Sequence, residues 1–218
     1  MKFSAIMAVL MTERYDALLV HSYMSPYNPE RHVLSLRGHM QMAAVASMYR
    51  EGEVAKIFLG IGHVWGKDKP TLSAVMKDNL IKRSVDPVDI VTFDDLAKET
   101  GASDVGDTKG EVELFLDLAN RNGWGNIASI ANRTHLKRVA TYQEAEVRLI
   151  STEDVLGAEY NRPHYIRFLE TFARSSAERK FVMRETIVRT LSRLGLDGVL
   201  RRAAKSPIVQ ALKLPFDR

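Results

Sequence analysis

The stretch IASIA at residues 127–131, followed directly by NRTHLKR at residues 132–138, decides the fold of this chain. Five small or apolar residues in a row are typical of a strand that is buried on both faces, as strands are in parallel sheets. The polar residues that follow predict the end of this strand and the start of a helix. The junction presents Thr134, His135 and Arg138 together, at the edge of a sheet where open α/β folds bind their ligands.

Strands and helices alternate on both sides of this stretch. The expected strands lie at 16–21, 56–61, 88–92, 127–131 and 146–150. Segments with helical periodicity separate them, bounded by Glu51-Gly52, Pro70-Thr71, Asp107-Thr108, Asn122-Gly123 and Thr134. Residues 93–107 are expected to form a long polar connection. This order predicts an α/β fold, in which a doubly wound, mostly parallel sheet of Rossmann-like order has helices on both faces.

The pattern changes to helices alone after Ser151. We therefore expect two parts, an α/β domain over residues 1–155 and a basic helical extension over residues 156–218 that packs on or beside it. Residues 1–150 hold 18 Lys and Arg against 19 Asp and Glu, whereas residues 151–218 hold 13 against 8. The net charge of +4 thus comes from the extension, whose amphipathic helices are expected to make either core contacts or peripheral membrane contacts.

The composition limits the chemistry. The chain has no cysteine, which excludes disulfides, thiolate catalysis and cysteine-based metal sites. No apolar run reaches the roughly 20 residues that a bilayer requires, and the apolar segment at residues 3–11 lacks the cleavage site of a secretory leader. A cytoplasmic protein is expected. Nucleic acid is not an expected partner, because no aromatic-interleaved basic motif is present.

Four segments together form a recognisable series: residues 15–20, 46–60, 72–90 and the pair of polar motifs at 107–108 and 134–139. In order and spacing they resemble the DUF218 family, the YdcF-, SanA- and ElyC-like proteins. The resemblance covers roughly residues 15–151. It implies a Rossmann-like fold, S-adenosylmethionine as a candidate ligand, because one member is reported to bind it, and a link to envelope-related metabolism.

The chain departs from the pattern of that family at three informative positions. His21-Ser22-Tyr23 stands where the family usually has a pair of glycines, and Glu111 stands where it has an asparagine. The arginine of the family's first helix would fall near Gln41.

The candidate site residues all lie near the carboxyl ends of expected strands, which meet at one edge of a parallel sheet. His135 is the candidate acid or base, and Arg138 is the candidate partner of a phosphate or carboxylate. Thr108 at a helix start would supply backbone N–H groups and a hydroxyl to an anion. The residues expected to bind a ligand or cofactor are His21, Ser22, Gly62, His63, Asp107, Thr108, Arg133 and Thr134.

Each of these residues also has a structural interpretation. Asp107 or Thr108 would serve as an ordinary N-cap, and His135 as a hydrogen-bonded core residue. Three functions therefore remain open. They are a small-molecule site for a nucleotide-like or phosphorylated ligand, a non-catalytic protein that docks on a partner or membrane through its tail, and a metal-assisted hydrolase that uses His21, His63 and His135. The number of associated chains is not set by the sequence.

Overall fold

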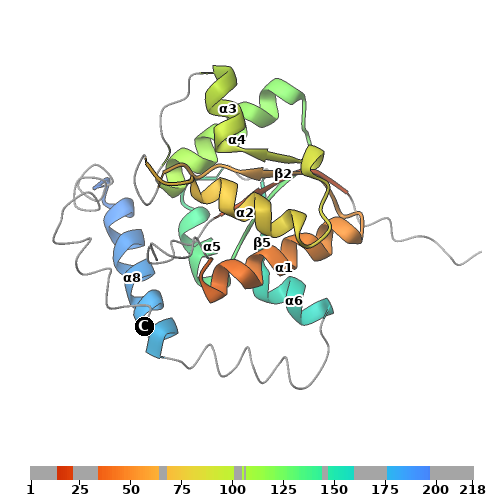
Figure 1. The fold of residues 1–218 in the computed structure, drawn as a ribbon. Coiled ribbons are helices and arrows are strands. Elements are labelled where there is room, and N and C mark those ends of the chain that lie inside the picture. The colour runs from red at the N-terminus through yellow and green to blue at the C-terminus, as the bar shows by residue number, and fades with distance from the viewer. Residues whose placement is uncertain are drawn as a thin grey trace, which may run out of the picture.

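Five parallel strands form one sheet in the order β3-β2-β1-β4-β5 in the computed structural model of the protein (Figure 1). Their bounds are Tyr15–Val20 for β1, Val54–Leu59 for β2, Ile90–Thr92 for β3, Ile127–Ala131 for β4 and Arg148–Ser151 for β5. The Rossmann-like, doubly wound order expected from the sequence is therefore confirmed. The strand order reverses between β1 and β4, which is the switch point where such sheets bind ligands.

The structure describes residues 14–21, 34–63, 68–100, 105, 107–143, 147–159 and 176–196. The expectations for the amino-terminal segment, for Ser22 and for the tail beyond residue 196 lie outside these ranges. The described helices are α1 Leu36–Arg50, α2 Leu72–Ile81, α3 Phe93–Thr100, α4 Thr108–Asn122, α5 Arg133–Val139, α6 Thr152–Glu159 and α8 Ser176–Arg193, and η1 Pro87–Asp89 is a short 3-10 turn.

The central strand β1 shows why the sheet needs helices on both faces. Leu18 and Val20 point into one apolar cluster, whereas Ala17 and Leu19 point into the other. All four are fully buried. Because successive side chains of a strand point to opposite faces, a strand buried on both faces is apolar throughout.

The helices divide between the two clusters according to their position along the chain. Helices α1, α2 and α6 supply residues to the first cluster, and α3 and α4 supply residues to the second. Figure 1 shows α3 and α4 above the sheet, with α1 and α6 below it. The second cluster contains Phe58 and Phe115, whose rings stack with centroids 5.8 Å apart. This pair joins α4 to β2, and so fixes the start of α4 over the carboxyl edge of the sheet.

The long polar connection expected over residues 93–107 is helical in its first half, because α3 occupies residues 93–100. Thr92 and Asp95 cap this helix reciprocally: the Thr92 hydroxyl accepts from the Asp95 N–H, and the Asp95 carboxylate accepts from the Thr92 N–H. This is a capping box. Phe93 and Leu96 are buried beneath the helix, so two apolar anchors and a cap outweigh the polar composition of the segment.

Two of the described helices follow the last strand. Helix α6 runs through the expected domain boundary at residue 155 and packs against α1, on the first face of the sheet. Helix α8 lies against α5, and Figure 1 shows it beside the sheet rather than over either face. None of the described helices is long and apolar enough to cross a membrane.

Candidate functional site

Five polar side chains from three segments of the chain gather at the switch point between β1 and β4. We call them the switch-point cluster: His21 follows β1, Thr108 and Glu111 lie in the first turn of α4, and His135 and Arg138 lie in α5, directly after β4. His21, Thr108, Glu111 and His135 are all buried. Buried polar groups need hydrogen-bond partners, and within the cluster most of those partners are other members.

His21 and Glu111 form the hydrogen-bonded pair of the cluster with the largest separation in sequence. Nδ1 of His21 lies 3.2 Å from Oε2 of Glu111, and the two side chains are 0% and 2% exposed. Successive side chains of a strand point to opposite faces of the sheet, so His21 points to the same face as Leu19. That face is covered by α4. Gly60 brings the helix close: an added Cβ there would lie 2.9 Å from the Phe58 ring and 3.7 Å from Cα of Glu111.

His135 is held from both of its ring nitrogens. The Arg138 guanidinium lies 3.0 Å from Nδ1, and the Thr108 hydroxyl lies 3.5 Å from Nε2. A guanidinium donates hydrogen bonds and accepts none, so Nδ1 of His135 carries a lone pair. The proton of the neutral ring is then on Nε2, pointing at the Thr108 oxygen. Thr108 and His135 therefore lie together, as the convergence of parallel strands predicts.

The cluster has a buried nitrogen that none of these contacts satisfies. Nε2 of His21 has no hydrogen-bond partner among the described residues, although the ring of His135 stands nearby with its centroid 5.6 Å away. On α1, the Gln41 side-chain amide donates to the carbonyl of Ile130 in β4 at 2.9 Å. Its Oε1 is likewise unpartnered within the described chain. Such an atom costs about 1–3 kcal/mol when it stays unpaired.

Helix α4 begins with a carboxylate cap rather than with exposed N–H groups. Asp107 is the N-cap, and its side chain accepts a hydrogen bond of 2.8 Å from the N–H of Gly110. Of the two N-cap interpretations, Asp107 is therefore the one that the structure shows. Glu111 adds a second carboxylate to the first turn, so the start of α4 presents acidic groups, and the cationic and neutral donors of the site come from α5.

The other residues expected at the site lie outside the cluster. The backbone of Gly62 bonds to Val105 and Leu72. Nδ1 of His63 lies 3.0 Å from the Lys69 carbonyl, within its own loop.

Two further candidates lie in the first turn of α5. The Arg133 guanidinium pairs with Asp154 of α6 at 2.5 Å, and its backbone N–H donates to Glu153. Thr134 is half-buried in the same turn. Arg133 thus faces α6.

Two buried polar residues of this edge, Glu111 and Gln41, were not expected as site residues. Glu111 falls on the buried face of an amphipathic helix among Val112 and Phe115, and a carboxylate at such a position signals a buried partner. Gln41 falls on the buried face of α1 in the same way. Among the described residues, no group of three or more His, Asp or Glu has an arrangement that could hold a metal ion.

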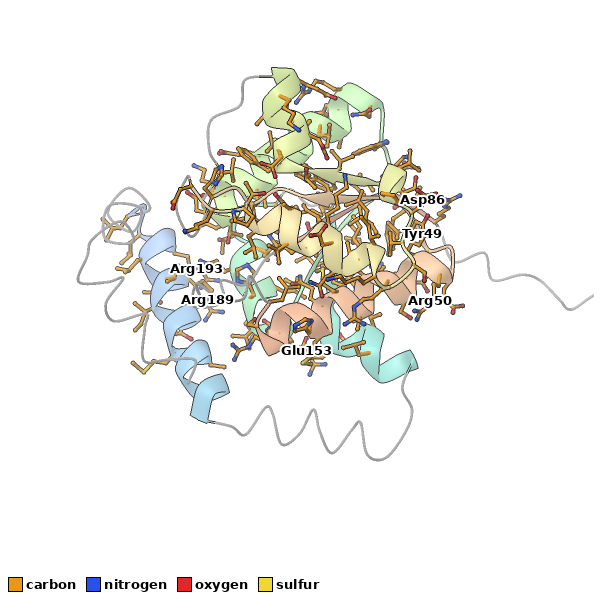
Figure 2. All side chains as sticks on the ribbon, in the orientation of Figure 1. Tyr49, Arg50, Asp86, Glu153, Arg189 and Arg193 are labelled. Atoms are coloured by element: carbon orange, nitrogen blue, oxygen red, sulfur yellow. The ribbon has the colours of Figure 1, made fainter. Side chains whose placement is uncertain are left out.

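A second polar cluster lies at the opposite edge of the sheet, where the strands begin. This amino-edge cluster consists of Tyr49, Lys56 and Asp89, and Figure 2 shows Tyr49 on the side of the molecule away from α8. The Tyr49 hydroxyl donates to Asp89 at 2.6 Å, and the Lys56 ammonium lies 2.7 Å from the other carboxylate oxygen. The hydrogen bonds from Lys56 and Tyr49 lower the pKa of Asp89, and the bond to Asp89 raises the pKa of Tyr49.

The fold and the site define an α/β protein of Rossmann-like topology with a buried polar cluster at its switch point. No family model matches the chain, and neither the curated proteins nor the solved structures show a similarity to it. The functional argument therefore depends on the chemistry of its own residues.

Proposed function

We propose that this protein binds a small anionic ligand, a nucleotide or another phosphorylated compound, at the carboxyl edge of the sheet. One observation carries the proposal. The switch-point cluster brings together side chains from the end of β1, from α4 and from α5, buries four of the five, and does so where the strand order reverses. Folds with this strand order bind ligands at that point, which is an analogy at the level of the fold and needs the chemistry of the site beside it.

The anion-binding part of the site is assigned to α5. Arg138 donates to His135, and a guanidinium with five N–H donors can hold an imidazole and a phosphate oxygen at once. Helix α8 lies against α5, and Figure 2 shows Arg189 and Arg193 on the part of α8 beside it. The positive charges of Arg138, Arg189 and Arg193 favour a phosphate over a neutral ligand.

Titration calorimetry on the full-length protein tests the proposal. The ligands are AMP, ribose 5-phosphate and S-adenosylmethionine; the last follows from the resemblance to the DUF218 family. Arg138→Gln should weaken binding of the phosphorylated ligands by at least about tenfold, since a hydrogen bond to a charged group contributes about 1.5–3 kcal/mol. Arg121→Gln is the matched control, because Arg121 pairs with Asp117 on the exposed surface of α4.

The calorimetric result has two outcomes that contradict the proposal. One is the absence of binding by every phosphorylated ligand at millimolar concentration. The other is equal loss of affinity in Arg138→Gln and Arg121→Gln, which would show that only overall charge matters. Binding that depends on Arg138 and His135, but not on Arg121, supports the proposal.

A second candidate function is docking on an anionic membrane surface through α8. Met183, Ile187 and Leu194 follow helical spacing on one side of the helix and are 66%, 49% and 67% exposed. The same helix carries five basic side chains against two acidic ones. An exposed apolar stripe with basic neighbours is typical of helices that lie in a membrane interface.

Vesicle co-sedimentation tests this second function. The full-length protein should pellet with vesicles that contain phosphatidylserine and stay in solution with phosphatidylcholine alone. Met183→Glu combined with Ile187→Glu should abolish the binding, whereas Val88→Glu, at an exposed apolar residue of η1, should not. Equal binding of the two vesicle types would contradict it.

A further inference from the structure

We infer that the ligand of this site carries a hydroxyl group beside its anionic group, and that this hydroxyl donates a hydrogen bond to Nε2 of His21. The inference rests on the proposed function, because it names the class of ligand for the same site: a phosphorylated polyol. A sugar phosphate and the phosphorylated ribose of a nucleotide share this chemistry.

The contact with Glu111 determines which nitrogen of His21 accepts. An ionised carboxylate only accepts hydrogen bonds, so the proton of the neutral ring lies on Nδ1, 3.2 Å from the carboxylate oxygen. Nε2 then carries a lone pair.

Of the two imidazoles, His21 is the one that can accept from a ligand. Nδ1 of His135 already receives the Arg138 guanidinium, and its Nε2 points at the Thr108 hydroxyl. Nε2 of His21 is buried and has no partner in the described part of the chain. A buried acceptor such as Nε2 of His21 is normally hydrogen-bonded, and a ligand hydroxyl could be its donor.

The hydroxyl and the anion must be close to each other in the ligand. The rings of His21 and His135 lie with their centroids 5.6 Å apart and tilted by 59°, and Arg138 lies directly against His135. His21 and Arg138 are therefore both neighbours of the His135 ring. A phosphate ester with a hydroxyl on a neighbouring carbon carries its anionic group and its hydroxyl close together.

Glu111 is a positioning residue in this arrangement. It holds the ring of His21 in one tautomer, as a buried carboxylate does for the histidine of other acid–base pairs. Gln41 lies at the same strand end, with its amide on the Ile130 carbonyl that also accepts from the His21 backbone N–H. His21 is thus fixed through its backbone and through Nδ1.

The experiment compares two phosphates of equal charge that differ only in hydroxyl groups. Glycerol 3-phosphate should bind the full-length protein about tenfold more tightly than propyl phosphate, because one hydrogen bond separates them. AMP and its 2′,3′-dideoxy analogue form the same comparison for the nucleotide source. His21→Asn should remove the preference, since the asparagine amide can still donate to Glu111 while nothing replaces Nε2.

A spectroscopic measurement on the unmodified protein makes the test independent of how the variant folds. The ¹⁵N shift of Nε2 in His21 should be that of an unprotonated nitrogen, and it should change when glycerol 3-phosphate binds but not when propyl phosphate binds. A proton on Nε2 in the free protein would overturn the inference, and so would a shift unaffected by the hydroxylated ligand.

The outcomes separate this inference from the proposed function. Equal binding of glycerol 3-phosphate and propyl phosphate, lost in Arg138→Gln, would overturn the hydroxyl contact and leave the anion site standing. The absence of binding by either phosphate, and by both nucleotides, would overturn the anion site and this inference with it. A tenfold preference that His21→Asn removes supports both.

Discussion

The two edges of the sheet hold polar clusters of opposite character. The amino-edge cluster is half-exposed, and its carboxylate receives hydrogen bonds from Tyr49 and Lys56. The switch-point cluster is mostly buried, joins His21 to Glu111 across 90 positions of sequence, and leaves one imidazole nitrogen without a partner in the described residues. A cluster that completes its own hydrogen bonds needs no ligand, whereas one that is buried and incomplete is typical of a functional site.

The largest difference between the edges should appear when one carboxylate contact is removed. Glu111→Leu leaves the N–H on Nδ1 of His21 buried without its acceptor, so the free energy of unfolding should fall by about 2 kcal/mol. Lys56→Ala at the half-exposed edge should lower it by less than about 1 kcal/mol. Urea denaturation of the two variants measures both values.

Glu111→Gln is the control for this prediction, because its amide oxygen can still accept from Nδ1 and should cost only about 1 kcal/mol. If Glu111→Leu were no more destabilising than Lys56→Ala, the claim that the two edges differ energetically would be wrong.

An intermediate effect is expected for the local polar contacts at the start of α3. The Thr92 hydroxyl both accepts from the Asp95 N–H and donates to its carboxylate. Thr92→Ala should therefore lower the free energy of unfolding by about 1 kcal/mol, the usual cost of a lost cap. Thr92→Ser, which keeps the hydroxyl, should lose less. Equal losses in thermal or urea unfolding would show that the methyl group, and not the cap, stabilises the helix.

The stability that the amino-edge cluster contributes should depend on pH at two limits. The lowered pKa of Asp89 gives stability that is present above its ordinary value of about 3.8 and is lost as the pH falls below it. The raised pKa of Tyr49 gives stability that is present below about 10.0 and is lost as the pH rises through the folded pKa.

Unfolding measured from pH 3 to pH 11 should thus show a plateau whose acid limb flattens in Asp89→Asn and whose alkaline limb flattens in Tyr49→Phe. Both changes should be below about 1 kcal/mol, because the pair is half-exposed. Limbs that are identical in the wild type and both variants would remove this cluster as their cause.

The smallest effect is expected for Arg133, which lies next to the switch-point cluster in sequence but faces Asp154 in the structure. Arg133→Ala should change the free energy of unfolding by less than about 0.5 kcal/mol, since exposed ion pairs contribute little. It should also leave the affinity for glycerol 3-phosphate unchanged. A loss of affinity comparable to that of Arg138→Gln would place Arg133 in the site after all.

The sequence predicts the fold well because the signals that set it are local. The run of five apolar residues in β4 and the alternation of strands with single helices define a doubly wound parallel sheet. Helix α3 is not predicted from the polar composition of its segment, although Thr92 and Asp95 have the spacing of a capping box. The apolar residues Phe93 and Leu96, which are buried, stabilise this helix.

The candidate site is predictable only in part. Topology brings Thr108 and His135 together, since both follow from where parallel strands end. The partner of His21 is not predictable, because Glu111 lies 90 positions away and its position depends on how α4 packs over β2. His21 and Glu111 are in direct contact, a relation that neither position reveals alone.

The most direct test of the central claim is a ¹H–¹⁵N chemical-shift map of the full-length protein titrated with glycerol 3-phosphate. The account predicts that the largest perturbations fall on the amides of His21, Thr108, Glu111, His135 and Arg138, and that those of Tyr49, Lys56 and Asp89 stay unchanged. Perturbations that centre on the amino edge or on α8, or none at millimolar ligand, would contradict it.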